Sequence, residues 1–405
     1  MESIPGGNAS DVNGPVFRGR LALQQRVLPA YRVPFYDALA SACMGGLSVF
    51  AGQPQPDESI AAASRLQVAR FVLARNWDPL NTSSPWYVLW QRGLLAWLRQ
   101  WDPQALIVEA NSRYSSNRLA VIWMHRRGRP VIGWGLGVPQ QDEPSGWSGA
   151  LAHLQARERA SYYRSLDGII AYSQRGADEY RELGIPPGRV FVAYNAATLR
   201  PKSPPPLRLP AFDGQPVVLF VGRLQARKRV DNLLHACATL PDELQPRLVI
   251  VGDGPARDEL LDLAKKIYPA AQFPGAQHGA ALEAYFAAAD LFVLPGTGGL
   301  AVQQAMSFSL PVIVAEGDGT QDDLVRPANG WRVRPGNLDD LTDTLRLALS
   351  DPARLRCMGA ESYRIVADEA NLEMMVKVFV QALSEASSTD DHSTEAESST
   401  DDHHS

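Results

Sequence analysis

Three basic side chains lie after an apolar run in the middle of the chain: Arg223 follows the run at once, and Lys228 and Arg229 stand just before a helical pattern. The run "VVLFVG" is typical of a buried strand that ends at Gly222, and a helical pattern begins just after the cations. Cations at the carboxyl end of a strand, beside the positive end of a helix, suit a diphosphate or a similar anion. The alternative is a solvated basic loop, so other features of the chain have to decide between the two.

Three glycine-rich loops follow other strand-like runs: "GDGP" at 252–255, "PGTGGL" at 295–300 and "GDGTQ" at 317–321. Glycine lets the backbone approach a ligand, and the N–H groups at a helix start can hold a phosphate without side-chain chemistry. A tight strand-to-helix connection also needs glycine. Because ligands of doubly wound sheets bind at the carboxyl ends of the strands, we expect these loops and the cations to form one site.

Apolar strand-like runs alternate with helical patterns along the chain, which is typical of α/β folds with parallel sheets. In the first half the expected strands are "RLALQQRVL", "GLSVF", "ALIVEA", "RPVIGW", "GIIAYS" and "VFVAY". In the second half they are "PVVLFVG", "RLVIVGDG", "LFVLPG", "LPVIVAE" and "NGWRVRP". We therefore expect an α/β fold with two doubly wound, Rossmann-like domains that face each other across a cleft.

The expected boundaries follow from composition and periodicity. Prolines cannot sit in helix interiors or central strands, so the proline-rich stretch at 200–215 is interpreted as an interdomain linker. Apolar residues at helical spacing predict a docking helix near the C-terminus. The expected parts are a disordered N-terminus (1–15), an N-terminal domain (16–199), the linker (200–215), a C-terminal domain (216–370), the helix (371–385) and a disordered acidic tail (386–405).

The composition is that of a soluble globular protein, with 405 residues, 45% hydrophobic and 20% charged. Six of the acidic residues lie in the tail, so residues 1–385 hold 39 basic and 38 acidic residues. This near-neutral balance does not indicate nucleic-acid binding. Three widely spaced cysteines suggest a reducing compartment. The polar N-terminus does not read as a signal peptide and no apolar run reaches the roughly 20 residues of a membrane span, so we expect a cytoplasmic protein.

The second half resembles the donor-binding domain of glycosyltransferase family 4, whose members have the GT-B fold. The resemblance runs through "FVGRLQARKRVDNLLHA", "LVIVGDGPARDEL", "FPGAQ", "YFAAADLFVLPG", "QQAMSFSLPVIVAEGDGTQDDLV" and "NGWRVRPGN", in that order. It implies a retaining transfer of a sugar from a nucleoside diphosphate donor, without a bound metal or other cofactor. We find no convincing metal-ligand spacing outside the tail.

The resemblance assigns roles to individual residues. Arg223 and Lys228 would hold the donor diphosphate and stabilise the charge that develops on it. Gln304 would bind the ribose. The remaining donor-binding candidates are Gly222, Gly275, Ala276, Gly298, Gly299, Leu300 and Thr320, of which Gly275 and Ala276 would lie against the base.

Two departures from the family pattern stand out. The family commonly has two glutamates eight positions apart, and here those positions are Gly296 and Gln304. Gly296 has no side chain with which to contact a donor sugar. The family's N-terminal histidine also has no obvious match, since "VIGWGLGVP" at 131–139 has none, and His125 reads as a surface or structural residue. A non-catalytic nucleotide-sugar-binding protein or partner subunit, and an epimerase of nucleotide sugars, are therefore the alternatives to a transferase.

Acceptor contacts are expected from the first domain, where the resemblance is weaker. The candidates follow two expected strands and are Tyr31, Arg32, Glu109, Asn111 and Arg113. Helix capping by Asn111 or Ser112, or ion pairing, is the structural alternative. The acceptor would be a glycan, a lipid-linked molecule or a small molecule.

The stretch "WYVLWQRGLLAWLRQW" at 86–101 holds four tryptophans, which would share one face if the whole stretch were helical. Such a face could pack on the first sheet or rest in a membrane interface. A peripheral membrane contact through 86–101 is therefore open at this point.

Overall fold

The computed structural model describes residues 15–56, 58, 60–82, 84, 86–138, 148–317 and 319–398, and only the backbone of 148–155 and 389–398. The chain divides into two compact units. The first unit runs up to Ala193 and resumes at Met375, and the second unit is Tyr194–Met374. The expected disordered N-terminus lies, except for Pro15, outside the described residues.

The first unit is built on a seven-stranded sheet in the order β3-β2-β1-β6-β7-β8-β9, and all its neighbouring strands are parallel. Its strands are β1 (Leu21–Val27), β2 (Leu47–Gly52), β3 (Arg70–Leu73), β6 (Ala105–Glu109), β7 (Val131–Gly135), β8 (Gly168–Ala171) and β9 (Val190–Val192). The central strands are buried along most of their length, as expected for a sheet covered on both faces. Each strand predicted for this half of the chain is present.

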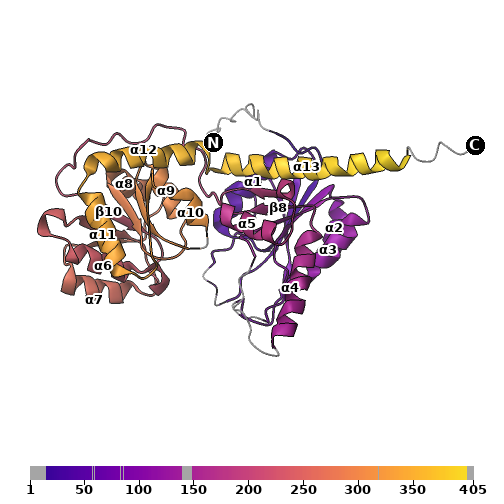
Figure 1. Ribbon diagram of the computed structural model, residues 1–405, viewed down its shortest axis with the longest axis horizontal. Coiled ribbons are helices and arrows are strands. Elements are labelled where there is room, and N and C mark those ends of the chain that lie inside the picture. Colours follow the sequence, from indigo (N-terminus) through magenta and orange to yellow (C-terminus); the bar gives the residue numbers. More distant parts are fainter. Residues whose placement is uncertain are drawn as a thin grey trace, which may run out of the picture. The chain divides into compact units, whose positions relative to one another are not determined.

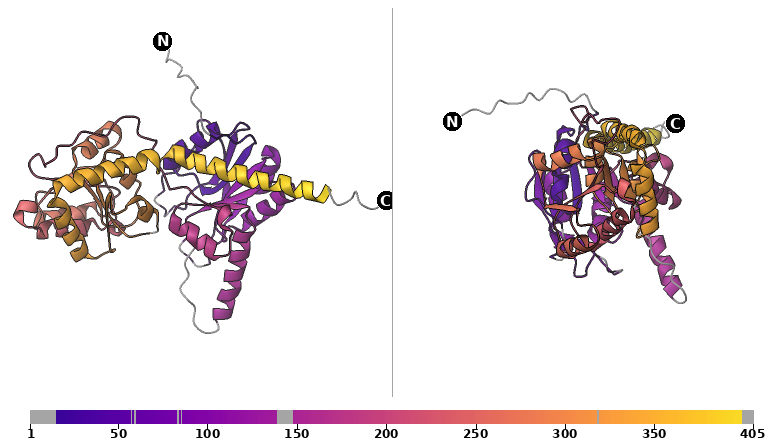
Figure 2. Two further views of the ribbon diagram at one scale, coloured as in Figure 1. Left: turned by 45° about the horizontal axis from the view of Figure 1, so that its top comes forward. Right: turned by 90° about the vertical axis from the view of Figure 1, so that its left-hand side faces the viewer.

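Helices cover both faces of this sheet. The helices are α1 (Val33–Ser41), α2 (Leu94–Trp101), α3 (Ser115–His125), α4 (Ser148–Arg164) and α5 (Gln174–Glu182). One core cluster joins side chains of α2, α3, α4 and α5 to the sheet. On the other face, the C-terminal helix α13 (Leu372–Ser398) packs Phe379 against Phe35 and Trp134, with ring centroids 4.8 and 5.0 Å apart. Figures 1 and 2 show α13, in yellow, running along the first unit.

The second unit has a six-stranded parallel sheet in the order β12-β11-β10-β13-β14-β15. Its strands are β10 (Val217–Val221), β11 (Arg247–Val251), β12 (Gln272–Gly275), β13 (Leu291–Leu294), β14 (Val312–Ala315) and β15 (Gly330–Val333). The sequence correctly predicts all of these except β12, which lies in the segment expected to be a loop against the base.

The helices of the second unit are α6 (Val230–Thr239), α7 (Arg257–Ile267), α8 (Gly279–Ala288), α9 (Ala301–Ser307), α10 (Thr320–Leu324), α11 (Leu338–Leu349) and α12 (Pro352–Asp368). Figure 1 shows α6, α7 and α11 on one side of β10, and α8, α9 and α12 on the other. The chain order changes direction between β10 and β13, the neighbouring strands at the centre of the sheet. In doubly wound sheets a ligand binds at this point, beyond the carboxyl ends of the strands.

The expected linker belongs to the second unit, whose first residue is Tyr194 rather than a residue near 216. Arg208 fixes this segment to the unit, because its guanidinium donates to the carbonyl oxygens of Phe286 and Phe308, each at 3.0 Å. Tyr363 adds a bond from its hydroxyl to the Ser203 carbonyl oxygen at 2.7 Å. Proline keeps this segment out of helices and strands, and these bonds attach it to the rest of the second unit.

The stretch 86–101 is not one helix, so the predicted tryptophan face does not exist. Trp90–Arg92 forms strand β5, which pairs antiparallel with β4 (Arg75–Trp77), and α2 begins only at Leu94. Gly93 separates the two with a left-handed φ of 87°, a conformation that glycine adopts readily. Trp97 is buried, whereas Trp90 is exposed.

The tail also differs from expectation. We predicted disorder from residue 386, but α13 continues through Ser398, and residues 399–405 lie outside the described part. The apolar positions of the helix before 386 anchor it on the first unit, which extends the helical backbone beyond them. No helix within the described residues is long and apolar enough to cross a membrane.

Candidate functional site

The side chain of Lys228 lies against the glycine-rich loop that follows β13. Lys228 ends a short 3-10 helix (Ala226–Lys228) after β10 and is only 6% exposed. Its Nζ donates to the carbonyl oxygen of Thr297 at 2.8 Å and to that of Gly298. Burial, together with the nearby charge of Arg227, lowers the pKa of Lys228 to about 8. The ammonium therefore lies where an anion would stabilise its charge.

Gly296 is the residue that allows this contact. A β-carbon at Gly296 would stand 2.5 Å from the Lys228 carbonyl carbon and still closer to the Arg227 carbonyl oxygen. Both are backbone atoms, which cannot rotate away as the end of a flexible side chain can. The absence of a side chain at Gly296 is thus a packing requirement of the loop, because the backbone of residues 227 and 228 fills the space.

The backbone next to Lys228 offers free donors. Gly298 and Gly299 have φ angles of 67° and 151°, which strongly favour glycine. Added β-carbons at these positions would come 3.9 and 3.7 Å from Lys228 Nζ. The N–H groups of Gly298, Gly299 and Leu300 have no acceptor within the described part of the chain. This loop can therefore present several N–H groups and one ammonium to the same anion.

The loops that follow β10, β11 and β12 meet at this edge of the sheet. Leu224 N donates to the Asp253 carbonyl oxygen at 2.9 Å, which joins the loops after β10 and β11. Gly252 N donates to the Gly275 carbonyl oxygen at 2.9 Å, so the end of β12 lies beside them. Gly222 approaches Gly252 so closely that a β-carbon on Gly252 would overlap the Gly222 carbonyl oxygen. Gly275 and the exposed Ala276 thus border the same edge as Gly222.

The remaining donor candidates follow neighbouring strands of the same sheet, β10, β13 and β14. Arg223 is exposed, and its side chain has no hydrogen bond or ion pair with any residue that the structure describes. Gln304 on α9 is half-buried, and its amide has no partner among those residues either. Its neighbour Gln303 is buried and instead bonds the backbone of Asn195 and Ala197, at 2.6 and 2.9 Å. Thr320 is the first residue of α10 and is half-buried.

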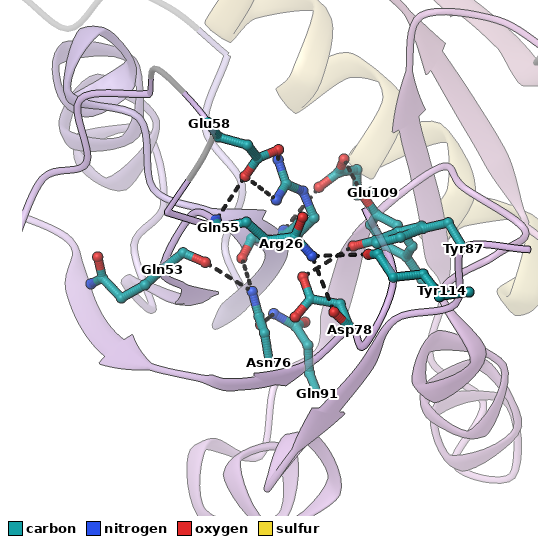
Figure 3. A network of polar contacts seen from close by, with 11 residues as sticks. Arg26, Gln53, Gln55, Glu58, Asn76, Asp78, Tyr87, Gln91, Glu109 and Tyr114 are labelled. Atoms are coloured by element: carbon teal, nitrogen blue, oxygen red, sulfur yellow. Dashed lines mark hydrogen bonds and ion pairs between the residues drawn. The ribbon is translucent and has the colours of Figure 1, made fainter. Parts of the chain in front are cut away.

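A second group of polar residues lies at the carboxyl ends of β1, β2 and β6 in the first unit (Figure 3). Arg26 and Glu58 form a two-armed ion pair with both contacts at 2.8 Å. Burial opposes the charge of each, but their mutual hydrogen bonds raise the pKa of Arg26 and lower that of Glu58. Glu109 accepts from Arg26 N and from the Tyr114 hydroxyl, each at 2.9 Å. The Glu109 carboxylate, at the end of β6, therefore links β6 to β1 and to Tyr114.

Amide side chains connect this network to a cavity. Asn76 Nδ2 donates to the carbonyl oxygens of Arg26 and Gln53, at 2.9 and 3.3 Å, and Gln91 Nε2 donates to Asn76 Oδ1 at 2.9 Å. Gln55 Nε2 donates to the carbonyl oxygens of Asp78 and Leu80 at 3.1 and 3.0 Å. The cavity has a volume of about 710 Å³ and is lined by residues 53–56, 74–76 and 78–81.

The cavity suits a polyhydroxylated ligand. Its polar lining side chains are Gln53, Gln55, Arg75, Asn76, Asp78 and Asn81. Amides both donate to and accept from hydroxyl groups, whereas the carboxylate accepts from them and the guanidinium donates to them. Pro54, Pro56, Pro79 and Leu80 offer apolar surface to C–H groups. Of the predicted acceptor residues, only Glu109 joins the network that supports this cavity.

The other acceptor candidates lie elsewhere in the first unit. Arg32 is 3% exposed and its guanidinium lies over the rings of Tyr31, Trp134 and Tyr172 at 4.8–5.3 Å, so it serves packing and is not available to an acceptor. Tyr31 is 45% exposed. The acceptor role predicted for Arg32 is therefore wrong.

Asn111 Oδ1 accepts from Arg113 N at 3.1 Å, and the Arg113 guanidinium lies 5.3 Å from the centre of the Tyr87 ring. Neither Asn111 nor Ser112 caps α3, which begins at Ser115 without a side-chain cap. The structural role considered for Asn111 is thus a local turn rather than a helix cap. His125 ends α3 and contacts Asp167 at 2.8 Å, a structural role as predicted.

Sequence reasoning missed the cavity residues at 53–56 and 74–81. One signal was available, since the polar run "QPQPDES" begins directly where the buried strand β2 ends. β3 and β4 gave no such signal because they are short and half-exposed. Among the described residues, His, Cys, Asp and Glu do not gather into a group that could hold a metal.

Comparison with known proteins identifies both halves of the chain. Residues 47–200 match the family "Glycosyltransferase Family 4" and residues 208–364 match "Glycosyl transferases group 1". A GDP-mannose-dependent alpha-mannosyltransferase of Mycolicibacterium smegmatis is 45% identical over 155 residues, which are 38% of this chain and 37% of the relative. A protein of the same name from Mycobacterium tuberculosis is 27% identical over 68% of this chain and 74% of its own.

The alignments cover only part of some relatives. The chain spans 37% of the M. smegmatis protein and 29% of the sulfoquinovosyl transferase of Arabidopsis thaliana, which is 32% identical over 36% of this chain. Two solved structures share the fold over most of the chain. Sucrose-phosphate synthase of Thermosynechococcus elongatus has a TM-score of 0.64 and 18% identity, and covers 92% of this chain and 100% of its own. Anabaena HepE, in complex with UDP, has a TM-score of 0.61 and 17% identity over 90% and 99%. Two glycosyltransferase family models therefore match the two halves of the chain, and the chain has the GT-B fold.

Proposed function

We propose that this protein is a glycosyltransferase that moves a sugar from a nucleoside diphosphate donor to an acceptor hydroxyl, with retention and without a bound metal. The observation that carries the proposal is the buried ammonium of Lys228 beside the free N–H groups of Gly298, Gly299 and Leu300. An anion at this place would gain one charge-assisted contact and several backbone bonds.

The donor diphosphate binds Lys228 and the backbone of 298–300, with Arg223 at the open side. As the bond between the sugar and the diphosphate breaks, negative charge grows on the leaving phosphate, and these groups stabilise it. Gln304 would bond ribose hydroxyls, and its half-buried amide, which has no partner in the described part of the chain, supports this role. Thr320 and the edge formed by Gly275 and Ala276 complete the donor site.

GDP-mannose is the first donor to test, because three mannosyltransferase relatives carry GDP-mannose in their names. Acceptor binding is assigned to the cavity of the first unit, whose amide-rich lining suits a polyol or a sugar. A D-inositol 3-phosphate glycosyltransferase of Nocardia farcinica, 31% identical over 197 residues, has a name that agrees with a polyol acceptor.

A thermal-shift screen of nucleoside diphosphates and nucleotide sugars tests the donor assignment. Ligands that bind the native state raise its unfolding temperature in proportion to the logarithm of their excess over Kd. We expect one nucleoside diphosphate and its sugar to stabilise the protein, and Lys228→Ala to remove that shift. The absence of any shift across the whole panel would contradict the proposal, and a shift without turnover on any acceptor would favour a non-catalytic binder.

A further inference from the structure

The antiparallel ribbon of β4 and β5 in the first unit has two different faces. Its register places Arg75 opposite Arg92, Asn76 opposite Gln91 and Trp77 opposite Trp90. Because side chains alternate along a strand, Asn76 and Gln91 share one face. That face points into the polar network, where Gln91 is 2% exposed and bonds Asn76 (Figure 3). The other face, here the Trp–Arg face, carries Arg75, Trp77, Trp90 and Arg92, of which Arg75 also borders the cavity.

The Trp–Arg face is open to solvent. Trp77 is 51% exposed and Trp90 is 38% exposed, and Trp86 near the start of β5 is 66% exposed. No other tryptophan whose side chain the structure describes is exposed. Leu73, Leu80 and Val88 add exposed apolar surface to the same segment of the chain. Exposed aromatic surface concentrated in one place marks an interaction site rather than ordinary surface variation.

The two arginines of this face lack counter-charges. Like charges directly opposite each other across two strands destabilise the pair. Neither Arg75 nor Arg92 forms an ion pair or side-chain hydrogen bond with the residues that the structure describes, and both are exposed. The single acid between residues 70 and 92 is Asp78, whose carboxylate accepts from the Tyr87 hydroxyl at 3.4 Å. An anionic partner would therefore relieve a repulsion that the fold leaves in place.

The geometry points to an anionic lipid surface as the partner. Tryptophan rings favour the headgroup level of a bilayer, and arginines beside them are attracted to negatively charged lipids. A second copy of the chain is a poorer partner, because a two-fold contact through this face would bring two arginine pairs together. We propose that the Trp–Arg face docks the first unit peripherally on anionic membranes, without a spanning segment.

Co-sedimentation of the full chain with phospholipid vesicles tests this proposal. We expect binding to phosphatidylcholine vesicles that contain phosphatidylglycerol, much weaker binding to pure phosphatidylcholine, and loss of binding at high salt. Arg92→Ala should lower the partition coefficient about fivefold, as expected for one basic residue near an anionic surface. The double variant Trp77→Ala/Trp90→Ala should lower it roughly tenfold or more, because it removes the apolar anchors.

Arg92→Glu separates binding from folding. It gives Arg75 an opposite charge across the ribbon, so the variant should be at least as stable as the wild type while losing its affinity for anionic vesicles. Arg126→Ala on the exposed end of α3 and Leu207→Ala, at a side chain that is 98% exposed, are the matched controls and should bind like the wild type.

Three results would overturn the proposal: equal binding to neutral and anionic vesicles, no binding of the wild type, or wild-type binding by the ribbon variants. Sedimentation of the protein without vesicles is run alongside. Concentration-dependent association that the tryptophan variants abolish would assign the Trp–Arg face to a second copy of the chain and reject the membrane.

Discussion

The α-carbon of Gly296 lies so close to Lys228 that a β-carbon on Gly296 would stand 2.5 Å from the Lys228 carbonyl carbon. This contact places Lys228 Nζ against the carbonyl oxygens of Thr297 and Gly298. In this chain the position where related enzymes commonly have a glutamate is therefore used to bring two loops together. In the proposed transferase, the donor sugar would be held by other groups, such as the backbone of the loop.

Gly296→Ala should destabilise the protein and weaken donor binding, and Gly296→Glu should do both more strongly. Overpacking against fixed backbone typically costs about 1–3 kcal/mol, and the shift needed to relieve it would move Lys228 from the loop. Urea denaturation and calorimetry with the donor nucleotide measure the two effects. Gly188→Ala is the matched control, because a β-carbon at Gly188 would meet no atom of the described residues within 4 Å. A Gly296→Glu variant with improved transfer would contradict this account.

Lys228→Met should abolish donor binding without destabilising the fold. Burial holds the folded-state pKa at about 8, against 10.5 for the unfolded chain. Between these values the unfolded chain holds a proton that the folded chain has released, so the free energy of unfolding of the wild type should rise with pH across this window. The Met variant should lack that rise and match or exceed the wild-type stability at pH 7. Urea titrations of both proteins from pH 7 to about pH 10 measure it.

Donor use should decline as pH rises through about 8. The diphosphate needs the protonated form of Lys228, and the free enzyme loses that proton near its pKa of about 8. The descending limb should therefore appear in kcat/KM for the donor, which reports the free enzyme. Lys228→Arg keeps its charge at alkaline pH, so any activity it retains should lack this limb. A wild-type profile that is flat up to pH 10 would exclude Lys228 as the phosphate-binding cation.

The sequence predicted most strands of the two parallel sheets well. It predicted irregular features, such as the break in the stretch 86–101 and the burial of Arg32, poorly. Buried runs such as "VVLFV" become β10 because a covered parallel sheet needs continuous apolar strands. Lys228 and the loop at 295–300 come together because both follow central strands of that sheet. The helix predicted over 86–101 is wrong because Gly93 breaks it, and the half-exposed strands β3 and β4 carry no clear period. The burial of Arg32 among three rings depends on tertiary packing that no local pattern encodes.

Gln53→Ala and Asp78→Asn should each raise the acceptor KM about fivefold, the effect of one lost hydrogen bond of about 1 kcal/mol. Both side chains line the cavity of the first unit, and neither lies in the donor site of the second unit. The donor Kd from calorimetry should therefore stay at the wild-type value. Gln100→Ala, an exposed residue on α2, is the control. Unchanged acceptor KM values in both variants would place the acceptor elsewhere while leaving the donor assignment intact.

Release of the nucleoside diphosphate from its sugar donor tests the central claim most directly. The wild type should release it in the presence of a polyol or sugar acceptor and form a glycosylated product of equal amount. Arg223→Ala and Lys228→Ala should each lower kcat/KM at least a hundredfold, since each removes a cation from the developing phosphate charge. Wild-type turnover by both variants, or binding of the donor without any product on all acceptors, would contradict the proposed transferase.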